Sequence, residues 1–95
     1  MTALMSAAAN NTNPEVLTTL LKAGAEVNAR KQNGGTALIV AAQYNTNPEV
    51  LSVLLKAGAD AEAKDNSGKT AFDHAEKNEK LKGTDVYWKL NDARF

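Results

Sequence analysis

The side chains best suited to catalysis or metal binding are few in this 95-residue chain. Its one histidine, His74, follows Asp73, and the chain has no cysteine. Nucleophilic catalysis needs a nucleophile, a base and a group that orients the base. A zinc site needs several cysteine or histidine ligands. A lone histidine on a polar helix is more often solvated or structural, so we expect no enzyme, no metal site and no cofactor.

Four other polar motifs have simpler structural explanations. Residues 65–68 (Asp-Asn-Ser-Gly) offer oxygens in series, but they lack the later glutamate of a calcium loop and fit a type I turn. The glycines at residues 34–35 lack the spacing and the lysine of a phosphate-binding loop. Glu15 and Glu49 stand at helix starts, where the helix dipole favours an acidic side chain. Residues 10–12 match a glycosylation sequon by chance.

Composition and charge exclude further classes of function. Eleven Lys and Arg balance eleven Asp and Glu, which gives no electrostatic reason to expect nucleic acid or an anionic membrane as a partner. The longest apolar stretch, residues 37–42, is far shorter than the roughly 20 residues that span a bilayer. The first residues lack the basic flank of a signal peptide, which favours a soluble protein of the cytoplasm.

A repeat of 34 residues organises the chain. Residues 2–35 and 36–69 are identical at 20 of 34 positions, and the blocks NTNPEVL and LLKAGA recur unchanged. The third copy keeps the same phase through Ala75 and then diverges. With two extra residues in its middle, its apolar positions also match, because Val86, Tyr87 and Leu90 fall on Val50, Leu51 and Leu54.

Each copy predicts a helix, a short loop, a second helix and an extended turn. In the second copy Thr36 is the expected N-cap of the first helix. Asn47 is the expected N-cap of the second helix, with Pro48 at its first position and Gly58 as the left-handed residue that ends it. The third copy should begin with a polar helix of sequence TAFDHAEKNEK. One such unit cannot bury its apolar stripe alone, so the units must stack.

These residues resemble the ankyrin repeat. The resemblance rests on Gly-x-Thr-Ala-Leu, Ala-Ala, Val-Leu-x-x-Leu-Leu-Lys-Ala-Gly-Ala and Asp-x-x-Gly. It implies an all-α solenoid of stacked helix-turn-helix units with short connecting β-turns. The chain is then a single domain, residues 1–95, with repeats at about 2–35 and 36–69 and a C-terminal capping repeat at 70–95. The family has the motif Thr-Pro-Leu-His, but the Pro and the His are absent from all three copies of this chain. One extra residue also lengthens the interhelical loop.

The resemblance implies a non-catalytic module that binds another protein through a concave surface of turn tips and first helices. Tyr44 is the strongest single candidate, because an exposed tyrosine offers a large rigid contact area and a hydroxyl. Packing of Tyr44 on the interhelical loop is an equally good interpretation. The candidate partner-binding residues are Arg30, Gln32, Asn33, Gln43, Tyr44, Lys64, Asn66, Lys69, His74 and Asn78.

A structural role is the alternative function. The chain begins inside a repeat. Either its first residue is a true start or, as we favour, the chain is the C-terminal part of a longer array. Tyr87, Trp88 and Phe95 are expected to close the other end of the stack. In the isolated chain, the exposed apolar residues on the N-terminal side should be buried against another molecule, for example in an end-to-end homodimer. Its candidate self-association residues are Met1, Leu4 and Met5.

Overall fold

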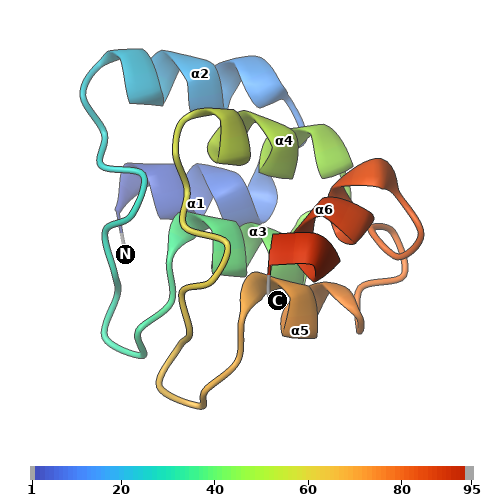
Figure 1. Ribbon diagram of the computed structural model, residues 1–95. Coiled ribbons are helices and arrows are strands. Elements are labelled where there is room, and N and C mark those ends of the chain that lie inside the picture. Colours follow the sequence, from blue (N-terminus) through green and yellow to red (C-terminus); the bar gives the residue numbers. More distant parts are fainter. Residues whose placement is uncertain (1, 94–95) are drawn as a thin grey trace.

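Residues 2–93 are described by the computed structural model, and they form six helices in three pairs (Figure 1). The helices are α1 (Ala3–Asn10), α2 (Pro14–Lys22), α3 (Ala37–Tyr44), α4 (Pro48–Lys56), α5 (Ala71–Ala75) and α6 (Asp85–Ala93). No residue between 2 and 93 lies in a strand. The expected all-α repeat fold is therefore confirmed.

The helix starts follow from the cap residues that the repeat supplies. Thr2, Thr36 and Thr70 are the N-caps of α1, α3 and α5, and each hydroxyl accepts a hydrogen bond from the backbone N–H three residues later. Asn13 and Asn47 cap α2 and α4, and each side-chain oxygen accepts a hydrogen bond from the backbone N–H two residues later. Each is followed by proline at the first helical position. These contacts are local, which explains why the repeated sequence predicts them.

Glycine ends the second helix of the first two copies. Gly24 and Gly58 have the same φ of 98°, in the left-handed region that other residues rarely adopt. Both α2 and α4 end at a lysine two residues before this glycine. A positive charge at the C-terminal end of a helix interacts favourably with the helix dipole.

The first helix of the third copy is shorter than its sequence predicts. The expected helix through Lys80 is wrong, because α5 ends at Ala75 and turns follow as far as Gly83. The N–H groups of Lys77 and Asn78 bond to carbonyls only three residues earlier, so the α-helical pattern is already lost there.

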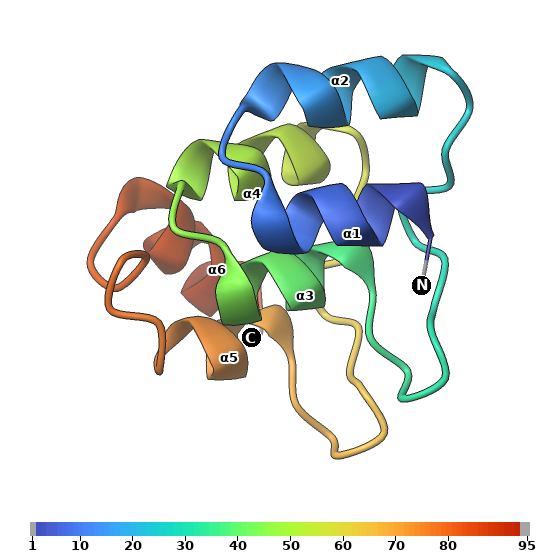
Figure 2. The ribbon, with the colours of Figure 1, turned by 180° about the vertical axis from the view of Figure 1, so that it is seen from behind.

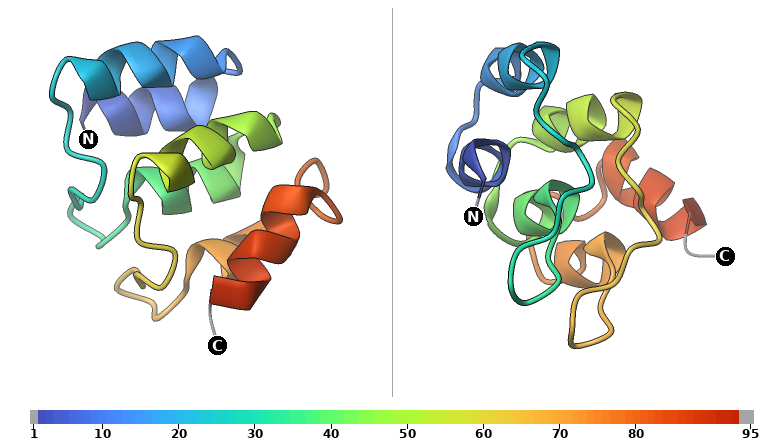
Figure 3. Two further views of the ribbon diagram at one scale, coloured as in Figure 1. Left: turned by 45° about the horizontal axis from the view of Figure 1, so that its top comes forward. Right: turned by 90° about the vertical axis from the view of Figure 1, so that its left-hand side faces the viewer.

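The helices form two layers (Figures 1 and 3). The first helices α1, α3 and α5 lie side by side in one layer, and α2, α4 and α6 lie side by side in the other. Leu17, Leu51 and Leu54 are completely buried between the layers. The connections at residues 23–36 and 57–70 extend from the same side of the stack, as both faces of the molecule show (Figures 1 and 2).

The apolar positions of the third copy are buried as predicted. Val86 and Leu90 are at most 2% exposed. Tyr87 is 6% exposed, and its ring lies 5.0 Å from that of Phe72. Trp88 differs from the prediction, because it is 54% exposed, although its ring lies 5.0 Å from that of Tyr87 in an edge-to-face arrangement. The expectation for Phe95 falls outside the described residues.

The N-terminal helix buries the residues that were expected to be uncovered. Leu4 and Met5 are each 1% exposed, so the prediction that they lie on an open apolar side is wrong. They belong to the core in which α1 packs against α2 and α3. The expectation for Met1 falls outside the described residues.

Candidate functional site

The two connections end in turns of the same backbone geometry. In the first turn the Lys31 N–H donates to the Gly35 carbonyl, and the Gly34 N–H donates to the Lys31 carbonyl, each over 2.9 Å. Asp65, Gly68 and Lys69 form the same two bonds at the same distances in the second turn. The turns therefore keep one shape although Lys31 occupies the place of Asp65.

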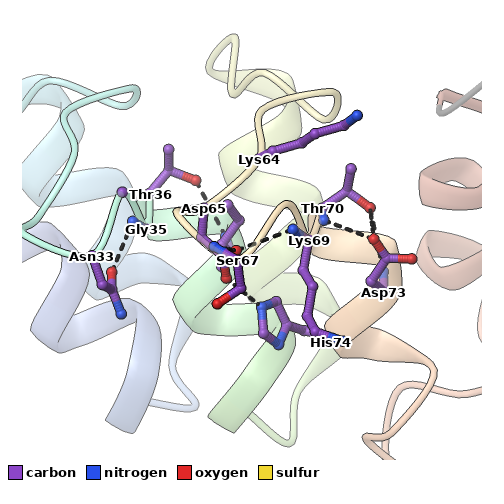
Figure 4. A network of polar contacts seen from close by, with 12 residues as sticks. Asn33, Gly35, Thr36, Lys64, Asp65, Ser67, Lys69, Thr70, Asp73 and His74 are labelled. Carbon is purple, nitrogen blue, oxygen red and sulfur yellow. Dashed lines mark hydrogen bonds and ion pairs between the residues drawn. The ribbon is translucent and has the colours of Figure 1, made fainter.

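The Asp65 carboxylate holds the second turn together (Figure 4). Its Oδ1 accepts hydrogen bonds from the backbone N–H groups of Ser67 (2.9 Å) and Lys69 (3.0 Å). Its Oδ2 lies 2.9 Å from Nε2 of His74, on α5. The His74 contact is the main cause that lowers the pKa of Asp65 below its ordinary value of 3.8, and the two backbone N–H bonds lower it further. His74 thus ties the turn to the next helix.

In the third copy Asp73 stands where the family pattern has its His, and it makes a contact of its own. The Asp73 side chain accepts a hydrogen bond of 2.9 Å from the Thr70 N–H, while the Thr70 hydroxyl accepts from the Asp73 N–H. This capping box fixes the start of α5. In the first turn, Asn33 Oδ1 accepts from the Gly35 N–H over 2.9 Å. Short side chains therefore rigidify both turns.

Hydrogen bonds also join the two turns to each other. The Arg30 guanidinium donates to the carbonyls of Gly34 (3.0 Å) and Lys64 (2.7 Å). The Asn66 backbone N–H donates to the Asn33 carbonyl over 2.8 Å, and its side-chain amide donates to the Gln32 carbonyl over 3.1 Å. Predicted partner-binding residues here hold neighbouring repeats together.

Four side chains around the turns remain exposed without a hydrogen bond or ion pair from their own side-chain atoms to the rest of residues 2–93. They come from both turns and are Gln32, Lys64, Ser67 and Lys69. We call this set the turn surface. Two of the four carry a positive charge, and within the described part of the chain the one ion pair is that of His74 with Asp65.

Gln43 and Tyr44 lie at the other end of α3 from the turns. Both are exposed, and Tyr44 is 59% exposed with no hydrogen bond from its hydroxyl to any described residue. The eight residues of α3 place them roughly 12 Å along the helix from the turn. The structure thus separates the sequence-predicted surface into two groups.

Asn78, predicted to bind a partner, joins two copies of the repeat in the structure. Its side-chain amide donates to the carbonyls of Ala42 (3.1 Å) and Asn45 (2.8 Å) at the end of α3. It therefore joins the third copy to the second.

Sequence reasoning missed Asn45, which makes the equivalent contact one copy earlier. Its amide donates to the carbonyls of Ala8 (2.7 Å) and Asn11 (2.9 Å), and the residue is only 2% exposed. Its oxygen accepts from the Asn47 N–H over 2.8 Å. We call the contacts of Asn45 and Asn78 the asparagine ladder.

The described residues offer little for other functions. Between residues 2 and 93, no three His, Cys, Asp or Glu side chains gather where they could hold a metal ion. None of the helices in that range has the length and hydropathy needed to cross a bilayer.

Comparison with known proteins agrees with the geometry. The family model for ankyrin repeats (3 copies) matches residues 2–86. No curated protein matches the chain significantly. Ankyrin repeats are in general non-catalytic modules of protein–protein interaction. With its two stacked helix layers, its paired turns and a match over most of its length, this chain belongs to the ankyrin repeat family.

Proposed function

We propose that this chain is a non-catalytic binding module whose main contact with a partner protein is the turn surface. The observation that supports the proposal most is the hydrogen bonding between the two turns. Arg30 and Asn66 hold the turns side by side, and the side chains of Gln32, Lys64, Ser67 and Lys69 are left exposed.

A fixed backbone favours binding because less conformational entropy is lost when the complex forms. The backbone of each turn is closed by two bonds of 2.9 Å, and Asp65 anchors the second turn to α5 through His74. Only the exposed side chains then have to become ordered when the partner binds. Those of Lys64 and Lys69 favour acidic groups on the partner.

Tyr44 is proposed as a second contact, separate from the turn surface. An exposed tyrosine is a frequent hot spot because its ring gives contact area and its hydroxyl can still form a hydrogen bond. A partner that reaches both Tyr44 and the turns must extend along α3.

The test is to isolate partners with the intact chain and to measure their affinity for variants. Tyr44→Ala and Lys69→Ala should each weaken binding, because the structure gives neither side chain a contact that holds the fold. A partner whose affinity is unchanged by both substitutions binds elsewhere, and this assignment of the surface is then wrong.

A further inference from the structure

A shallow hollow of about 370 Å³ lies between α2 and α4, which run side by side in the layer of second helices (Figure 3). It is separate from the turn surface, because no residue of either turn lines it. Its lining comes from the C-terminal halves of the two helices and from the residue that follows α4. The lining residues are Thr18, Leu21, Lys22, Val53, Lys56 and Ala57.

The hollow combines an apolar lining with two positive charges. Leu21 and Val53 are half-buried, so part of each apolar side chain remains accessible. The Thr18 hydroxyl donates a hydrogen bond to the carbonyl of residue 14 over 3.3 Å, so it is already satisfied within α2. The side-chain polar groups that remain are the ammonium groups of Lys22 and Lys56, both of which are exposed residues. Lysine stems are apolar and extend the lining toward solvent.

Neither lysine has an acidic partner within residues 2–93, where the one ion pair joins the second turn to α5. The acidic residues that follow the two helices, Glu26 and Asp60, form no ion pair with Lys22 or Lys56. The Asp60 carboxylate instead accepts a hydrogen bond of 2.9 Å from the backbone N–H two residues later. The helix dipole explains a lysine at the end of each helix, but it does not explain the apolar hollow between them.

Two other hollows in the layer of second helices have a different chemistry. One of about 290 Å³, between the starts of α4 and α6, is lined by the carboxylates of Glu49 and Asp85 and by no lysine. One of about 300 Å³ on α2 has Glu15 as the charged residue of its lining. The third copy also has Asp92 at the position that Lys56 occupies in the second copy. A lysine pair around an apolar hollow therefore distinguishes the contact of α2 with α4.

Each of the two helices also carries a glutamate seven residues before its lysine. Glu15 and Lys22 on α2, like Glu49 and Lys56 on α4, are two helical turns apart, so they share one face at a separation of roughly 10 Å along the axis. The rims of the groove are therefore negative where the helices begin and positive where they end. A uniformly anionic surface, such as a membrane, would be attracted to one end and repelled by the other. A helix with an acidic first turn and a basic last turn complements both ends when it lies antiparallel to α2 and α4, and the helix dipoles favour the same direction.

We propose that the hollow between α2 and α4 is a docking site for an amphipathic helix of a partner protein, which inserts apolar side chains between Leu21 and Val53 and places its acidic first turn over Lys22 and Lys56. We call the six lining residues the lysine groove. A volume of about 370 Å³ lies at the lower end of the range of ligand sites. An extended peptide would gain little here, because α2 and α4 use their backbone groups within the helices. The lysine groove is independent of the binding proposed for the turn surface.

The experiment titrates the full chain with a synthetic helical peptide, acetylated and amidated at its ends. The peptide has glutamates in its first turn, leucines at three- and four-residue spacing and lysines in its last turn. Backbone amide NMR signals of residues 18–22 and 53–57 should shift, with a Kd below about 1 mM. The double variant Lys22→Gln, Lys56→Gln should bind at least about fivefold more weakly, and a peptide with Gln in place of Glu should lose affinity for the natural chain by a similar factor. Lys89→Gln, the same change on α6, is the control and should alter the affinity less than about twofold.

Ala57→Leu is a second test that does not depend on charge. It places a larger side chain in the hollow, so it should weaken peptide binding at least about threefold. Ala23→Leu is the matched control, because Ala23 has nearly the same backbone angles at the end of α2 but does not line the hollow. Urea unfolding of every variant checks that it remains folded at the temperature of the titration.

Four results would overturn the proposal. They are no binding up to about 1 mM peptide, equal effects of the lysine variants and Lys89→Gln, equal effects of Ala57→Leu and Ala23→Leu, and shifts confined to the turn surface. Vesicles of phosphatidylglycerol provide the remaining comparison. The chain should not sediment with them, and binding to vesicles that is lost in Lys22→Gln, Lys56→Gln would make an anionic lipid surface the occupant instead of a helix.

Discussion

The side-chain amide of Asn45 lies 2.9 Å from the carbonyl oxygen of Asn11, 34 residues earlier in the chain. Asn45 thus closes the end of α1, and Asn78 closes the end of α3 in the same way, through carbonyls 33 to 37 residues earlier in the chain. A buried amide with two carbonyl partners fixes the position of one repeat on the next.

Removing the donors of Asn45 should therefore destabilise the whole stack. Asn45→Asp keeps the oxygen that accepts from Asn47 but places a carboxylate beside two carbonyl oxygens at a site that is 2% exposed. We expect a loss of about 3 kcal/mol or more in the free energy of unfolding, measured in urea at neutral pH. The matched control is Asn11→Asp, which should change it by less than about 0.5 kcal/mol. Similar losses in both variants would contradict this role of Asn45.

Leu54 and Leu20 form a second matched pair. Leu54 is 0% exposed, so Leu54→Ala should cost about 2–5 kcal/mol of unfolding free energy, as buried leucines usually do. The equivalent Leu20 is half-buried, and Leu20→Ala should cost less than about 2 kcal/mol. Thermal or urea unfolding of the two variants measures the difference. A loss below about 1 kcal/mol for Leu54→Ala would show that the shared core does not depend on this residue.

Stability should depend on pH through Asp65. Its pKa is lowered in the folded state, mainly by the hydrogen bond from His74. A lowered pKa means that the contribution of Asp65 is fully present above the unfolded value of about 3.8 and is lost as the pH falls through the lower folded value. The stability difference between the natural chain and Asp65→Asn should therefore shrink when the pH falls below about 3.8.

Urea unfolding at a series of pH values measures this effect. His74→Ala is the control, because without the histidine the folded pKa of Asp65 should rise and the loss should begin at a higher pH. If the natural chain and Asp65→Asn keep a constant stability difference down to pH values well below 3.8, the turn does not depend on the ionised carboxylate.

Gly34 and Gly58 should respond differently to the same substitution. Both have positive φ, but a Cβ on Gly34 would lie 2.7 Å from Oδ1 of Asn66, whereas one on Gly58 would meet nothing within 4 Å. Gly58→Ala should cost about 1 kcal/mol through backbone strain alone. Gly34→Ala should cost more, because it also pushes apart the turns that Asn66 joins. Unfolding in urea compares the two, and an equal cost would show that this contact between the turns adds nothing to stability.

Substitutions at the proposed contact residues should change the affinity for a partner without changing the stability of the chain. Tyr44→Ala and Lys69→Ala should weaken the complex with a partner while the melting temperature of the chain changes by less than about 2 °C. Ser52, on α4, lies outside the turn surface, so Ser52→Ala should leave the affinity unchanged. Titration calorimetry and thermal unfolding of the same samples give both quantities. Loss of binding in Ser52→Ala alone would place the contact on the second helices.

The sequence by itself determined the repeat, the six helices and most of their ends. A threonine or asparagine cap bonds to an N–H two or three residues away, and Gly24 and Gly58 adopt positive φ within their own turns. Such contacts depend on a few neighbouring residues, so a repeated sequence is sufficient to predict them. Val50, Leu51 and Leu54 are among the apolar positions that recur between the second and third copies, and all three are buried.

Only the tertiary structure decided which polar side chains hold the stack and which are free. Arg30, Asn45, Asn66 and Asn78 find their acceptors 33 to 37 residues away, on the neighbouring repeat, where no local pattern indicates them. The burial of Leu4 and Met5 was likewise decided by the packing of α1 against α3. Hydrogen bonding and burial between repeats depend on how the units are placed in space, and the sequence of one unit specifies only its own shape.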